Sequence, residues 1–139
     1  MKRLIIIAVS LIMFLVLQGI LYSKLMQKSV HLSIQKEDIA DIEVYGSGGT
    51  KKIEDVALID NIIMWFNQLS DIRVNKDFEG TTPESGIIIN LKSGKKISIL
   101  NSGSDFEIQR NDVRPENVSY WGKQQDIKAY LQGLIEGSN

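Results

Sequence analysis

Residues 86–100 read GIIINLKSGKKISIL and predict a β-hairpin. Residues 86–92 and 95–100 are rich in isoleucine, a β-branched residue that favours strands. Ser93-Gly94 between them fits a tight turn. Residues 105–110, DFEIQR, then alternate polar and apolar side chains, which is the period of a half-buried strand. Together the three segments predict an antiparallel meander.

Two amphipathic helices are expected on either side of this meander, at roughly residues 55–69 and 123–135. Apolar residues recur at spacings of three or four in both, which places them on one helix face. Glu54 and Asp55 suit the start of the first helix, where a carboxylate can accept free backbone N–H groups. Trp65 borders the apolar stripe and is expected to close the edge of the core. The stripes consist of Val56, Ile59, Ile63 and Phe66 in the first helix and Ile127, Tyr130, Leu131 and Leu134 in the second.

Shorter strands are expected before and after the first helix. Residues 31–34, 41–45 and 50–53 have strand-like patterns, and the last two are joined by the glycine-rich turn 46–49. Residues 71–74 predict another short strand, while 76–85 and 111–119 have the composition of loops. Strands grouped between helices indicate an α+β fold with a mainly antiparallel sheet, whose helices we expect on one face.

The N-terminal run from residue 4 to residue 22 contains no charged side chain and follows Lys2 and Arg3. As a helix it would extend about 28 Å, close to the thickness of the hydrocarbon core of a bilayer. No pair of small residues marks a cleavage site after it, so the pattern favours an uncleaved signal anchor. The alternatives are secretion after cleavage and, less in keeping with so apolar a run, a buried helix of a soluble protein.

This interpretation divides the chain into a transmembrane signal anchor (1–22), a juxtamembrane stalk (23–30) and an extracytoplasmic α+β domain (31–139). We expect the protein in the cell membrane, held by residues 4–22, with its domain outside the cytoplasm. All 17 acids and all but two of the 16 bases follow residue 22, so the domain carries a mild net charge of about −3. It has no basic stripe with interleaved aromatic residues, and nucleic acid is therefore not an expected partner.

No motif in the chain predicts catalysis, a cofactor or a metal. The chain has no cysteine, and His31 is its only histidine, close to the stalk and far from any recognisable nucleophile turn. The acids between residues 37 and 43 lack the spacing of a calcium loop, and Asp77, Glu79 and Glu84 in the loop 76–85 are discounted in the same way. We therefore expect a non-enzyme that binds a protein or peptide of the cell envelope. A small membrane-tethered hydrolase using carboxylates or a Ser–Lys pair stays open as an alternative.

Tyr120 and Trp121 are the candidate partner-binding residues. An exposed Tyr-Trp pair would be a good anchor for a partner, and it would favour a further alternative, an immunity or inhibitor protein. The competing interpretation is that both rings pack into the core at the start of the last helix.

Four segments also carry a resemblance. These segments are residues 33–45 (SIQKEDIADIEVY), 51–69 (KKIEDVALIDNIIMWFNQL), 86–100 and 119–134 (SYWGKQQDIKAYLQGL). Together with Lys2 and Arg3 before the apolar run, they resemble small membrane-anchored or secreted proteins of the Gram-positive Firmicutes. The resemblance implies an extracytoplasmic α+β module without known catalysis, and it carries no functional residues over to this chain.

Overall fold

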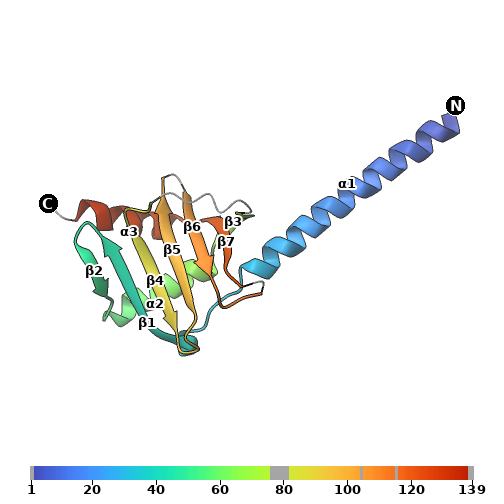
Figure 1. The fold of residues 1–139 in the computed structure, drawn as a ribbon. Helices are drawn as coiled ribbons and strands as arrows, with labels where there is room; N and C mark the ends of the chain where they lie inside the picture. Colours follow the sequence, from blue (N-terminus) through green and yellow to red (C-terminus); the bar gives the residue numbers. More distant parts are fainter. Residues whose placement is uncertain (1, 76–81, 104, 115, 138–139) are drawn as a thin grey trace.

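The computed structural model describes residues 2–75, 82–103, 105–114 and 116–137; in the first helix it describes the side chains of Ile7, residues 9–22 and Val30 (Figure 1). In chain order the elements are α1 (Lys2–Val30), the 3-10 turn η1 (Lys36–Asp38), β1 (Ile39–Gly46), β2 (Gly49–Lys52), α2 (Val56–Asn67), β3 (Ser70–Val74), β4 (Gly86–Leu91), β5 (Lys96–Ser102), β6 (Asp105–Arg110), β7 (Val118–Lys123) and α3 (Gln125–Glu136).

The described strands form one antiparallel sheet in the order β2-β1-β4-β5-β6-β7-β3. The predicted hairpin is confirmed, because Ile87 pairs with Ile99 and Ile89 with Ile97. Gly94 at its turn has a φ of +79°, a conformation that glycine adopts without steric cost. The strand predicted at 105–110 is confirmed as β6 beside β5.

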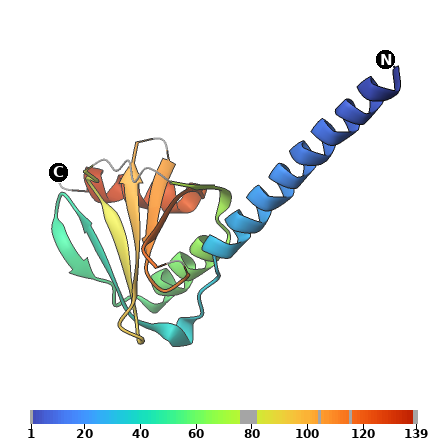
Figure 2. The ribbon, with the colours of Figure 1, turned by 45° about the vertical axis from the view of Figure 1, so that its right-hand side comes forward.

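Helices α2 and α3 cover one face of this sheet (Figures 1 and 2). Alternate strand residues point to the helices and form the core with Ile62 and Phe66 of α2 and Ile127 and Leu131 of α3, all at most 1% exposed. From the strands the core receives Ile42, Val44, Ile87, Ile89, Leu91, Ile97, Ile99, Phe106, Ile108, Val118 and Tyr120. The α+β class with two amphipathic helices on a mainly antiparallel sheet is therefore confirmed.

The first of these helices starts as expected. Asp55 is its N-cap, and one carboxylate oxygen accepts the backbone N–H groups of Ala57 and Leu58 at 2.9 and 3.4 Å. Trp65 is half-buried and packs on Tyr130 of α3, with ring centroids 6.3 Å apart, so it closes the core edge. Val56, in contrast, is 60% exposed, because it lies in the first turn beyond the edge of the packed face.

Two local predictions are wrong. Residues 31–34 form no strand; the main-chain groups of Ile34 bond to the Asn67 side chain and the Leu32 carbonyl to Arg110, in place of a neighbouring strand. Residues 118–119, expected in a loop, begin β7, and the last helix starts at Gln125. Residues 118–119 are in a strand because Val118–Lys123 pairs with β6 on one side and with β3 on the other. Such pairing is not visible in a local pattern.

Helix α1 runs through the segment predicted as a stalk and ends at Val30, from which the chain enters the domain (Figures 1 and 2). Most of the helix projects away from the sheet. Its described apolar side chains between Ile7 and Tyr22 are exposed, from 51% for Ile20 to 70% for Met13, whereas Val30 at its end is buried. Within the described part of the chain, no helix has the length and apolar character required to cross a membrane.

Candidate functional site

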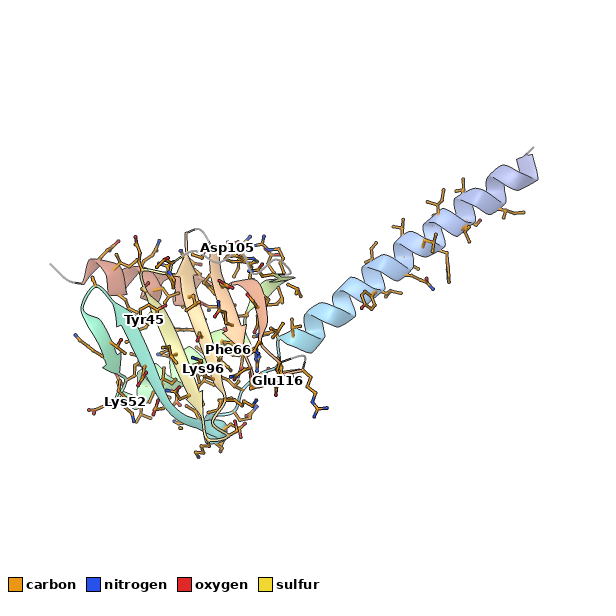
Figure 3. All side chains as sticks on the ribbon, viewed as in Figure 1. Tyr45, Lys52, Phe66, Lys96, Asp105 and Glu116 are labelled. Carbon is orange, nitrogen blue, oxygen red and sulfur yellow. The ribbon has the colours of Figure 1, made fainter. Side chains whose placement is uncertain are left out.

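The face of the sheet opposite α2 and α3, which we call the outer face, is covered by no helix or strand among the described residues. Successive strand residues point to opposite faces, so the pairing register identifies the side chains that belong here. Several are half-buried apolar or aromatic groups between polar ones, an arrangement suited to contact with another molecule. The outer-face side chains are Asp41, Glu43, Tyr45, Arg73, Ile88, Asn90, Lys96, Ser98, Leu100, Glu107, Gln109, Ser119 and Trp121. Figure 3 labels Tyr45 and Lys96 among them.

A hollow of about 200 Å³ opens over β5, β6 and β7 on the outer face. Its lining residues are polar except for Val118, and none of them is a carboxylate. The lining residues are Lys96, Ser98, Gln109, Arg110, Asn111, Asn117, Val118 and Ser119. We refer to it as the β5–β7 pocket.

Several hydrogen-bonding groups of the pocket are available to a ligand. Among the described residues, neither the Lys96 ammonium nor the Ser98 hydroxyl has a hydrogen-bond or ion-pair partner. Asn111 accepts the backbone N–H of Lys96 through its side-chain oxygen at 2.8 Å, which leaves its amide N–H₂ group to donate. The Arg110 guanidinium, in contrast, is occupied by Asp112 and by the carbonyl of Leu32. The pocket therefore presents an ammonium, a hydroxyl and amide groups, a set that recognises polar groups of a ligand.

Beside the pocket lies a buried carboxylate. Glu107 is only 2% exposed although it points to the outer face. One of its oxygens accepts the Ser119 hydroxyl, the Gln109 amide at 3.2 Å and the Asn75 amide at 3.4 Å. A buried carboxylate requires such donors, because its desolvation is otherwise costly. Glu107 thus fixes Gln109 and Ser119, two side chains of the pocket wall.

The two candidate partner-binding residues lie on β7 and, as neighbours on a strand, point to opposite faces. Tyr120 is fully buried among the core residues, and burial raises the pKa of its phenol to about 12. Trp121 is half-buried on the outer face, directly across from Glu107 on β6. The structure therefore separates the pair, and only Trp121 lies on the face that contains the pocket.

His31 lies at the entry of the chain into the domain. Its Nδ1 is 2.9 Å from the Tyr120 hydroxyl, and its ring packs on Phe66 with centroids 4.9 Å apart. Burial, and then the positive charge of Arg110, lower its pKa to about 4 from an ordinary value of 6.5. It is a neutral part of the packing near pH 7.

The acidic residues between 37 and 43 lie on η1 and β1. Asp41 accepts from Asn90 at 2.6 Å and pairs with Lys52 at 3.4 Å, contacts that lower the pKa of its carboxyl. Glu37 and Asp38 are exposed. No group of three potential metal ligands is found within the described ranges; Asp77 and Glu79, also considered as calcium ligands, lie outside those ranges.

Comparisons with protein-family models, with curated proteins and with solved structures find no match to this chain. The site therefore rests on its own geometry. Sequence reasoning missed the β5–β7 pocket, because Lys96, Ser98 and Gln109 looked like ordinary solvent-facing positions of alternating strands. The one signal available was the run of polar side chains at alternate positions of adjacent strands.

Proposed function

We propose that this chain is a single-pass membrane protein whose extracytoplasmic domain binds a protein or peptide of the cell envelope on the outer face of its sheet. The observation that carries the binding part is the β5–β7 pocket. It lies on the uncovered face and holds donors without partners among the described residues. The half-buried Trp121 lies close by on β7 and would add apolar contact area.

Membrane attachment is supported by α1. Its side chains at residue 7 and from 9 to 22 are exposed, and nearly all of them are apolar. A contiguous apolar surface of this kind is unfavourable in water and calls for a covering partner. In the full sequence the uncharged row begins at residue 4, so it continues beyond the part of α1 whose side chains are described, and as a whole it comes close to the length that a bilayer requires. Lipid is the covering that suits a helix apolar on every side.

The chemistry of the pocket suits the polar groups of a peptide chain. A peptide offers carbonyl and carboxylate oxygens to the Lys96 ammonium and to the Asn111 amide, and N–H groups to the oxygens of Ser98 and Asn117. No acid lines the pocket to repel a carboxylate. The Glu107 charge lies beside it but is turned toward its three neutral donors.

Site-specific photo-crosslinking in native membranes tests this proposal. A photoreactive residue replaces Gln109, which is exposed and lines the pocket, or, as the matched control, Asn61, which is exposed on α2. We expect one discrete adduct from position 109 and none from position 61. K96E in the same protein should weaken the adduct, whereas K51E on β2 should not. Equal crosslinking from both positions, or no effect of K96E, would contradict a site in the pocket.

The same experiment separates the alternatives. A hydrolase is supported by one observation, the Ser119 hydroxyl hydrogen-bonded to the buried Glu107 at the pocket. It predicts cleavage of the captured peptide, which S119A should abolish without preventing capture. An immunity or inhibitor protein would instead show a toxin or peptidase as its adduct.

A further inference from the structure

The segment between α1 and β1 is bound to the domain at four successive points. Val30 is 2% exposed and Ile34 is 5% exposed, so both ends are packed into the core. Between them, His31 contacts Tyr120 and Phe66, and the Leu32 carbonyl accepts Arg110 Nη1 at 2.8 Å. We call Val30–Ile34 the junction strap.

Asn67, the last residue of α2, holds the far end of the strap. Its side-chain oxygen accepts the backbone N–H of Ile34, and its amide donates to the Ile34 carbonyl, both at 2.9 Å. Two bonds from one side chain satisfy both main-chain groups of a residue that belongs to no strand. A side chain in this place fixes the direction in which the chain leaves α1.

The centre of the strap depends on an uncharged His31. From β6 the Arg110 guanidinium faces this ring. The guanidinium pairs with Asp112 at 2.7 and 2.6 Å and lies 5.5 Å from the Phe66 ring centroid. From β7 the facing titratable group is the Tyr120 phenol, and α2 presents Phe66, which does not titrate. Within the described residues the buried Nε2 of His31 has no hydrogen-bond partner. An added proton would therefore create a buried cation next to Arg110. Burial and the Arg110 charge disfavour that cation more than the Phe66 backbone carbonyl favours it.

We propose that the junction strap holds the domain in one orientation on α1 while His31 is neutral, and that protonation of His31 releases the strap and frees the domain to rotate on its anchor. The strap is a property of the folded chain and needs no ligand in the β5–β7 pocket, but rotation on an anchor rests on the membrane attachment proposed above. Release would move the outer face relative to whatever surface α1 is fixed in.

Distances between spin labels in the full chain, reconstituted in lipid nanodiscs, test the proposal. The chain has no cysteine, so Gln18→Cys in α1 and Gln125→Cys in α3 place two labels without background. We expect one narrow distance distribution at pH 7, broadening as the pH falls through about 4. His31→Gln, which does not titrate, should remove the pH response, while circular dichroism confirms a folded domain.

Asn67→Ala provides a test that needs no acid. It should broaden the distribution already at pH 7, whereas Gln68→Ala, at an exposed amide next to it, should leave the distribution narrow. A broad distribution in the unmodified sequence at pH 7 would overturn the proposal, as would a narrow one in Asn67→Ala. If the distribution stays narrow below pH 4 in a folded domain, or broadens equally in His31→Gln, the role of His31 is wrong.

Discussion

At the scale of single residues, the domain withdraws ionisable groups from water, among them the buried Glu107 and the partly buried His31. Glu107 is accommodated by three neutral donors, and His31 by remaining uncharged. Neither position could be identified from the sequence. Glu107 lies in an alternating strand where a polar residue normally points to water, and only the neighbouring strands and Asn75 bury it.

Glu107→Ala should destabilise the domain by about 1–3 kcal/mol, because the Ser119, Gln109 and Asn75 donors lose their common acceptor. Urea unfolding measures the change. Glu37→Ala, at an exposed acid of η1, is the control and should stay within about 0.5 kcal/mol of the unmodified protein. Equal effects of the two substitutions would show that the buried network contributes nothing.

His31 should make stability depend on pH. Its pKa is about 4 in the folded state and near 6.5 when unfolded, so between these values the unfolded chain binds more protons. The contribution of neutral His31 is therefore complete above pH 6.5 and is lost progressively as the pH falls to about 4. Unfolding free energies of the unmodified chain and of His31→Gln should diverge over that window. Parallel curves would contradict the burial of a neutral imidazole.

At the scale of elements, the sequence predicted those that depend on local signals and missed those that depend on tertiary pairing. The β4–β5 hairpin and the helix at 56–67 were predicted because turn residues, capping and periodicity are local. Strand β7 was missed because its position between β6 and β3 depends on residues distant in sequence. The strand expected at 31–34 failed for a related reason: Asn67 satisfies the main chain of Ile34 in place of a neighbouring strand.

The N-cap of α2 gives a quantitative test of a feature that was predicted from local sequence. Asp55→Ala removes the acceptor of the Ala57 and Leu58 N–H groups and should cost about 0.5–2 kcal/mol of stability. Asp55→Ser and Asp55→Asn retain a capping oxygen and should recover most of the loss. Thermal or urea unfolding decides, and a Ser variant as unstable as the Ala variant would argue against the cap.

At the scale of the whole molecule, the chain combines a projecting apolar helix with a domain whose sheet is covered on one face only (Figures 1 and 2). Under the proposed function, the helix contacts lipid and the outer face contacts a macromolecule. The junction strap connects them.

Labelling of single cysteines in intact cells tests the proposed topology. Asn61→Cys, exposed on α2, should react with a membrane-impermeant maleimide, whereas Lys2→Cys should react only after lysis. The protein should stay in the membrane fraction after carbonate extraction. Recovery of a shortened chain in the medium would instead support secretion after cleavage. Labelling of intact cells at position 2 alone would show the opposite orientation, with the domain in the cytoplasm.

The sequence by itself determined the α+β class, the central hairpin, the two amphipathic helices and the apolar row of residues 4–22, because each depends on neighbours within a few turns or a single strand pair. Tertiary structure alone decided the strand order, the separation of Tyr120 from Trp121, the burial of Glu107 and His31, and the β5–β7 pocket. These features depend on which strands lie side by side and which face the helices cover. The strand neighbours and the covered face are determined by the burial of apolar surface across the whole chain, which a local sequence pattern does not contain.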